Sequence, residues 1–162
     1  AESCSAGAPS SRSIRASRLI YLLGGFPAYL EQTLRDSLVW HAMLEAHSNG
    51  AVLGGSSAGA MVLCQHYYDP ASDSLQEGLN LLPNTCLIPH HNRVCKGWGN
   101  ALPAALPGVT LIGIDEQTGL INDQPGGGWT VYGKGAVTCY QNDQITLHQA
   151  NDSFILEMHP KQ

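Results

Sequence analysis

The sequence predicts an α/β sandwich of three layers, in which helices cover both faces of a mostly parallel sheet and a C-terminal region of antiparallel hairpins follows. Over the first half of the 162 residues, short apolar runs alternate with a long amphipathic stretch, as expected of strand–helix–strand units joined by right-handed crossovers. The last third instead contains short apolar runs separated by glycines and by Asn142-Asp143, a pattern typical of hairpins.

The predicted elements follow each other along one domain. Residues 1–17 are rich in Ser and Ala without an apolar period, so we expect a tail or linker ahead of a single domain over 18–162. The apolar runs predict buried strands over 19–23, 51–53, 79–88 and 109–114. Helical patterns predict a helix over 27–46, a helix start from 58 and a short helix over 98–106, with a loop over 67–78. Short antiparallel strands are expected over 120–121, 129–132, 136–140, 145–147 and 154–158.

One turn has the spacing of a nucleophile elbow. The apolar run over 51–53 leads into Gly55-Ser56-Ser57-Ala58-Gly59, which fits Gly-x-Ser-x-Gly, and a helix start follows. A serine on such a turn projects its hydroxyl above the sheet, and the flanking glycines remove side chains that would clash. The helix N-terminus behind it can donate N–H groups to an oxyanion. A turn of Gly and Ser without catalytic function could have the same sequence pattern. The partners of the serine therefore decide between the two interpretations.

The partners of the serine are expected at other strand ends. A serine nucleophile needs a base within hydrogen-bond reach and an acid that orients the base. His90 and Glu116 each follow a predicted buried strand, and the carboxyl ends of strands in open α/β sheets meet at one crevice. His91 and Asp115 could replace them, although adjacent side chains on a strand point opposite ways. Gly24-Gly25 ends the first strand and forms either a tight turn or a backbone donor to the oxyanion.

Together these motifs resemble the peptidase E (aspartyl dipeptidase) and cyanophycinase family of serine peptidases. The resemblance covers about residues 19–140 and rests on Leu23-Gly24-Gly25, Gly55 to Ala60, Pro89-His90, and Gly113-Ile114-Asp115-Glu116-Gln117-Thr118-Gly119-Leu120. It implies a sheet organised as in class I glutamine amidotransferases. It also implies Ser57 as nucleophile, His90 as base and Glu116 as the third member of the triad. The implied oxyanion donors are the amides of Gly25 and Ala58.

The resemblance implies a serine peptidase that hydrolyses small peptides after an N-terminal aspartate through an acyl-enzyme. An aspartate side chain needs a cation, and Arg93 and Lys96 follow the predicted base within one short loop. Three alternatives stay open: a non-catalytic relative that binds a small acidic ligand or a partner, a cyanophycinase-like hydrolase, and a glutamine-amidotransferase-like hydrolase. Cyanophycinases typically have an Asp two residues before the base and several arginines after it, so Ile88 and the single arginine of the loop disfavour the second alternative. The third normally requires a cysteine at the elbow, where this chain has Ser57.

The sequence departs from the family pattern in three respects. Phe26 follows the glycine pair where the family usually has Asn or Asp, and His91 follows the base where the family usually has Phe. Relatives have further strand–helix units before the glycine pair, so either this chain is an N-terminally shortened variant or a partner completes the sheet. An uncovered strand edge invites pairing, and we therefore expect a homodimer or a higher homo-oligomer.

Composition argues against several other classes. A net charge of -5 without a Lys/Arg cluster argues against nucleic-acid binding, and no apolar run is long enough to span a bilayer. The five cysteines are scattered without a Cys-x-x-Cys pair, which favours a reduced, cytoplasmic chain. The seven histidines lack metal-ligand spacing, so neither a metal nor a cofactor is predicted.

Overall fold

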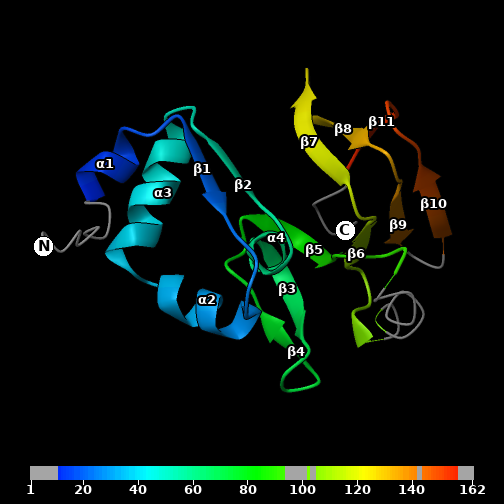
Figure 1. Cartoon of the computed structure of the whole chain (residues 1–162), viewed down its shortest axis with the longest axis horizontal. Coiled ribbons are helices and arrows are strands. Elements are labelled where there is room, and N and C mark those ends of the chain that lie inside the picture. The colour runs from blue at the N-terminus through cyan, green and yellow to red at the C-terminus, as the bar shows by residue number, and fades with distance from the viewer. Residues whose placement is uncertain (1–10, 94–101, 103–104, 142–143, 157–162) are drawn as a thin grey trace, which may run out of the picture.

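The computed structural model describes residues 11–93, 102, 105–141 and 144–156 (Figure 1). The helices are α1 (Ser11–Arg15), α2 (Pro27–Leu34), α3 (Leu38–Ser48) and α4 (Ala58–Met61). The strands are β1 (Leu19–Leu22), β2 (Val52–Gly55), β3 (Cys64–Asp69), β4 (Ser74–Glu77), β5 (Leu82–Ile88), β6 (Thr110–Ile114), β7 (Thr118–Gln124), β8 (Gly128–Gly133), β9 (Val137–Gln141), β10 (Gln144–His148) and β11 (Ser153–Ile155). In Figure 1, α1, α2 and α3 lie on the left and β6 to β11 on the right.

The described strands form three sheets. β1 and β2 pair in parallel as a two-stranded sheet. The largest sheet has the order β10-β9-β6-β5-β3-β4, in which β3, β5 and β6 run parallel and the other neighbours antiparallel. β11-β8-β7 form the antiparallel third sheet. The architecture is therefore consistent with the predicted α/β sandwich, but its sheets are mixed instead of mostly parallel. The parallel strands are extended on both sides by strands of opposite direction.

The predicted helix over 27–46 is divided into α2 and α3. Asp36 has a positive φ of 57°, which helix residues do not adopt, so the chain leaves the helical path there. Ser37 then acts as the N-cap of α3, because its Oγ accepts a hydrogen bond from the Trp40 N–H at 3.0 Å. The pattern of apolar residues continues across this break, and for that reason periodicity alone did not reveal it.

The predicted loop over 67–78 is a hairpin instead. β3 and β4 pair antiparallel, and Asp69 at the end of β3 organises the turn between them. Its carboxylate accepts hydrogen bonds from the backbone N–H groups of Ala71 and Ser72 and from the Ser72 hydroxyl. The Pro, Asp and Ser residues that suggested a loop are those that this tight turn requires.

The largest buried cluster lies behind the predicted elbow. It includes Leu22 of β1, Trp40 of α3, Met61 of α4 and Tyr67 of β3. Two further buried clusters contain residues of the six-stranded sheet. One is centred on Cys86 and Leu111, and the other joins residues of β6, β8 and β9. The elements that surround the elbow are therefore fixed by apolar burial, which gives the turn a rigid support.

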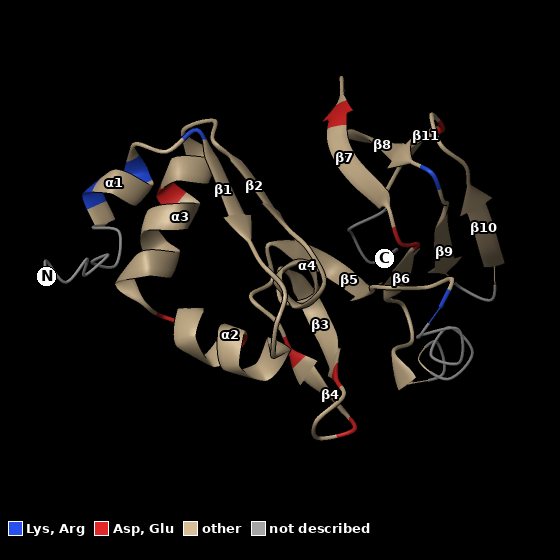
Figure 2. Cartoon of the chain, viewed as in Figure 1, with Lys and Arg blue, Asp and Glu red and all other residues tan. Residues whose placement is uncertain are grey.

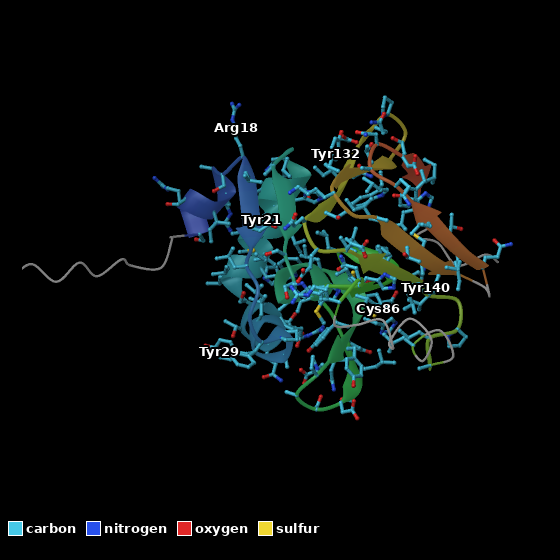
Figure 3. All side chains as sticks on the ribbon, turned by 45° about the vertical axis from the view of Figure 1, so that its right-hand side comes forward. Arg18, Tyr21, Tyr29, Cys86, Tyr132 and Tyr140 are labelled. Atoms are coloured by element: carbon cyan, nitrogen blue, oxygen red, sulfur yellow. The ribbon has the colours of Figure 1, made fainter. Side chains whose placement is uncertain are left out.

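The predicted buried strand over 19–23 is buried on one face only. Leu22 points into the core, whereas Leu19, Tyr21, Leu23 and Val52 are between 54% and 72% exposed. Since Leu19 and Val52 are register partners in neighbouring strands, these side chains form one apolar outer face of the β1–β2 sheet. In Figure 3, Tyr21 lies on the same side of the molecule as Arg18 and Tyr29, away from Tyr132 and Tyr140.

The predicted tail over 1–17 differs from the structure at its C-terminal end. Residues 11–15 form α1, which packs on α3 and buries Ile14. Arg15 Nε also donates a hydrogen bond to the Glu45 carboxylate at 2.5 Å, and Figure 2 shows basic segments on α1 and an acidic segment on the neighbouring α3. The predicted helix over 98–106 lies mostly outside the described residues. Within the described ranges, no helix combines the length and apolar character needed to cross a membrane.

Candidate active site

Ser57 lies on the sharp turn between β2 and α4. Its φ is 50°, a value that non-glycine residues seldom adopt and that is typical of a strained strand-to-helix turn. The turn also requires glycines on both sides. A Cβ on Gly55 would lie 2.5 Å from the backbone of Gly59, and a Cβ on Gly59 would lie 2.2 Å from the Leu22 carbonyl oxygen. The structure therefore has the local geometry of the predicted elbow.

His90 is in hydrogen-bond contact with Ser57. The distance from His90 Nε2 to Ser57 Oγ is 2.8 Å, across a gap of 33 positions in the sequence. His90 follows the end of β5 and has a φ of 119°, which is strained for a residue with a side chain. The two side chains thus have the separation that a serine nucleophile and its general base require. The expectation that strand ends bring these residues together agrees with the geometry.

The glycine pair that follows β1 lies beside Ser57. A Cβ on Gly24 would be 3.2 Å from the Ser57 Cβ, and the Leu22 carbonyl accepts a hydrogen bond from the Ser56 N–H at 3.0 Å. Ala58 is buried at the first position of α4, and its N–H has no hydrogen-bond acceptor among the described residues. The same holds for the N–H of Gly25 within the described chain. Neither amide is committed to an acceptor in the described chain, and Gly24, the neighbour of Gly25, lies against Ser57.

Glu116 contacts Arg93 instead of His90. Arg93 Nη1 donates to the Glu116 carboxylate at 3.1 and 3.4 Å, and the Glu116 N–H donates to Asn92 Oδ1 at 3.2 Å. No hydrogen bond between described residues links Glu116 to His90. The Arg93 side chain is 70% exposed and that of Glu116 36%, so the pair lies at the open surface next to the Ser57–His90 contact. Lys96, the other predicted cation, lies outside the described residues.

His91 points away from Ser57 into a separate group of polar side chains. Its Nε2 is 2.6 Å from the Tyr140 hydroxyl, and its Nδ1 is 3.7 Å from Asp115 Oδ1. Asp115 also accepts a hydrogen bond from the Ala136 N–H at 3.0 Å. Burial and the nearby Asp115 carboxylate raise the pKa of Tyr140, so the phenol stays neutral near pH 7. His90 and not His91 is therefore the histidine in contact with Ser57, and Asp115 lies beside His91.

The cysteines within the described ranges are poor candidates for a nucleophile or a ligand. Burial raises the pKa of the Cys64 and Cys139 thiols to about 11 and raises that of Cys86 further, so these thiols are protonated and unreactive. Across the described ranges, no three His, Cys, Asp or Glu side chains gather as a metal site requires. Two hollows of about 200 and 220 Å³ border Cys139 and Arg35 respectively, not Ser57.

Comparison with known proteins identifies the family of this chain. The model of peptidase family S51 matches residues 5–124. The chain belongs to peptidase family S51. The matched S51 region contains Ser57, His90, Glu116 and the glycine pair, which are the residues selected from the sequence. The suspected relationship to the peptidase E family is thereby confirmed.

Two solved structures have a similar fold. A peptidase from an acI-B1 Actinobacterium is 30% identical with a TM-score of 0.77, and the match covers 90% of this S51 chain and 62% of that chain. A candidate peptidase E protein from Listeria monocytogenes EGD-e is 16% identical with a TM-score of 0.53, with 87% and 64% covered, and supports the fold alone. The chain thus spans less than two thirds of each of these proteins. No curated protein sequence matches it.

Two features of the S51 site were not found from the sequence. No sequence feature indicated that Arg93 pairs with Glu116. Arg93 was assigned to substrate binding and Glu116 to the triad. The Tyr140 partner of His91 is 49 positions away and depends on the pairing of β6 with β9. The departure of His91 from the family pattern was the available clue, since a polar residue in place of Phe needs a polar partner.

Proposed function

We propose that this S51 chain is a serine peptidase that hydrolyses small peptides after an N-terminal aspartate. The observation that carries the proposal is the 2.8 Å contact between His90 Nε2 and Ser57 Oγ, with Ser57 on a strained elbow. A serine hydroxyl becomes nucleophilic when a positioned base removes its proton. Membership of a peptidase family supports this interpretation over a plain Gly/Ser turn.

In the proposed reaction, Ser57 Oγ attacks the carbonyl carbon of the substrate while His90 Nε2 takes the hydroxyl proton. The carbonyl oxygen becomes an oxyanion that accepts hydrogen bonds from the Gly25 and Ala58 N–H groups. The carbon–nitrogen bond then breaks, and His90 returns the proton to the leaving amine. Water attacks the acyl-enzyme with His90 again as base, which releases the aspartate and restores Ser57.

Glu116 is the proposed third member of the triad, although its carboxylate holds Arg93 in the structure. An orienting acid must accept a hydrogen bond from His90 Nδ1, which has no hydrogen-bond partner among the described residues. Both members of the Arg93–Glu116 pair are solvent accessible, and surface pairs of this kind are weak, on the order of 0.2–1 kcal/mol. A rotamer change of Glu116 toward His90 is therefore inexpensive in free energy.

Arg93 is the proposed contact for the substrate aspartate. Only its Nη1 is engaged by Glu116, so within the described chain the Nη2 and Nε donors have no acceptor. A guanidinium with a free edge can hold a second carboxylate. Arg93 is thereby suited to hold an acidic substrate, and its Nη1 also becomes free once Glu116 turns toward His90. Lys96 is the second candidate for this contact.

The test is hydrolysis of Asp-Leu by the purified 162-residue protein and by a Ser57→Ala variant. Loss of a triad nucleophile costs on the order of 10⁶ in turnover. Ser56→Ala is the matched control, because it removes the neighbouring hydroxyl from the same turn and should retain most of the activity. A Ser57→Ala variant that keeps a tenth of the activity rules out this nucleophile. Binding of Asp-Leu without any turnover by the wild type favours the non-catalytic alternative.

A further inference from the structure

The backbone of His90 is held in an unfavourable conformation. A φ of 119° costs on the order of 1–3 kcal/mol for a residue with a side chain, and such strain persists only where the surroundings determine it. The hydrogen bond with the Ser57 hydroxyl restrains the tip of the His90 side chain but not its backbone. The Arg93 N–H donates to the His90 carbonyl at 3.2 Å, so residues that follow His90 in the same turn contribute to the restraint.

His91 is the best-anchored residue of that turn. Its N–H donates to the Ile114 carbonyl at 3.1 Å, and its ring lies edge-on to Tyr140 with 5.7 Å between the centroids. The Tyr140 hydroxyl and His91 Nε2 are 2.6 Å apart, and Nδ1 faces Asp115 at 3.7 Å. In the tautomer with its hydrogen on Nδ1, the phenol donates to Nε2 and the Nδ1–H faces the carboxylate.

The surroundings of His91 are rigid. Gly113 leaves the space for the ring, because a Cβ there would lie 2.6 Å from His91 Cδ2. Tyr140 is on β9, which pairs with β6, and it packs on the buried cluster around Cys86 (Figure 3). Asp115 is joined to the start of β9 by hydrogen bonds with both backbone groups of Ala136. His91 is thus attached to two paired strands at once.

We propose that His91 is a positioning residue, which holds the strained His90 backbone so that the imidazole stays on Ser57. Its hydrogen bond to Tyr140 and its contact with Asp115 fix the turn after β5 to β6 and β9. His91 does not touch the reacting atoms. The inference rests on the proposed roles of Ser57 and His90.

The test compares His91→Phe with Tyr140→Phe. The first introduces the usual residue of the family but leaves the Tyr140 hydroxyl of this chain without its His91 partner, and the second removes only that hydroxyl. Misplacement of a catalytic group by about 1 Å can cost on the order of 100-fold in rate. We expect the kcat for Asp-Leu to fall by between about tenfold and 100-fold in His91→Phe, and by a smaller factor in Tyr140→Phe, with KM within about twofold. Tyr132→Phe is the control, because it removes a phenol that bonds Asp123 far from the turn.

The double variant separates positioning from general destabilisation. If His91 acts through Tyr140, the double change to Phe should be no slower than His91→Phe alone. A structural role would lower the melting temperature in step with kcat, whereas positioning lowers kcat with the melting temperature nearly unchanged. Wild-type kcat in His91→Phe, additive losses in the double variant, or an equal loss in Tyr132→Phe overturns the proposal.

A readout without turnover keeps this proposal separate from the proposed function. The nitrogen resonances of His90 report its contact with Ser57 by NMR whether or not the wild type hydrolyses peptides. They should shift in His91→Phe and Tyr140→Phe and stay in place in Tyr132→Phe. If the His90 resonances stay in place in all three variants, the positioning role is rejected. If they shift in His91→Phe and Tyr140→Phe but the wild type hydrolyses no peptide, only the proposed peptidase activity is rejected.

Discussion

Replacement of Arg93 by Ala should reduce hydrolysis of Asp-Leu selectively. The Arg93 side chain is 70% exposed and its partner Glu116 36%, so their pair adds little to folding stability, on the order of 0.2–1 kcal/mol. A hydrogen bond to a charged group contributes about 1.5–3 kcal/mol, which corresponds to roughly 10- to 150-fold in kcat/KM. We therefore expect kcat/KM on Asp-Leu to fall by that factor with an almost unchanged melting temperature.

Asn-Leu provides the matched substrate for this prediction. It has the shape of Asp-Leu without the charge, so the wild type should cleave it much more slowly, and Arg93→Ala should change its rate little. Arg18→Ala is the control variant, because it also shifts the net charge from -5 to -6 but removes an arginine just before β1, at the opposite end of that strand from Gly24-Gly25. Equal rates of the wild type on Asp-Leu and Asn-Leu, or equal losses on both substrates in Arg93→Ala, would refute the acidic pocket.

Three further predictions concern the acid, the elbow and the assembly. Glu116→Gln should lower kcat for Asp-Leu at least about tenfold, and a larger loss in Asp115→Asn would reassign the triad acid. Gly59→Ala should lower the free energy of unfolding by about 1–3 kcal/mol or more in urea titrations, because its Cβ would lie 2.2 Å from the Leu22 oxygen; an unchanged midpoint contradicts the tight elbow. The free edge and exposed face of β1, with Tyr21 on it, should produce a homodimer in light scattering at micromolar concentration, and a monomer alone would contradict this.

The strands that carry the site were predictable because their signals are local. β5 and β6 are apolar runs that end at Pro89 and Asp115, and parallel neighbours place His90 and Glu116 at one edge of the sheet. The elbow was predictable because close backbone approach leaves only glycine possible at 55 and 59. Both features depend on backbone geometry, which short motifs encode directly.

The remaining features depend on competition between distant groups. The break between α2 and α3 results from a positive φ at Asp36 inside an otherwise continuous apolar pattern. The direction of the Glu116 side chain depends on whether Arg93 or His90 lies within reach, which spacing along the chain does not determine. Tyr140 meets His91 only through the register of β6 with β9. Pairings of this kind follow from tertiary structure and have no sequence motif.

The central claim is that His90 activates Ser57, and labelling with a fluorophosphonate tests it most directly. The reagent bonds covalently to an activated serine and requires no knowledge of the substrate. Intact-mass analysis of the wild type should show one added phosphonyl group, and peptide mapping should place it on Ser57. Ser57→Ala and His90→Ala should remain unlabelled, whereas Ser56→Ala should react like the wild type. A folded wild-type protein that stays unlabelled, or a label on another residue, would contradict the claim.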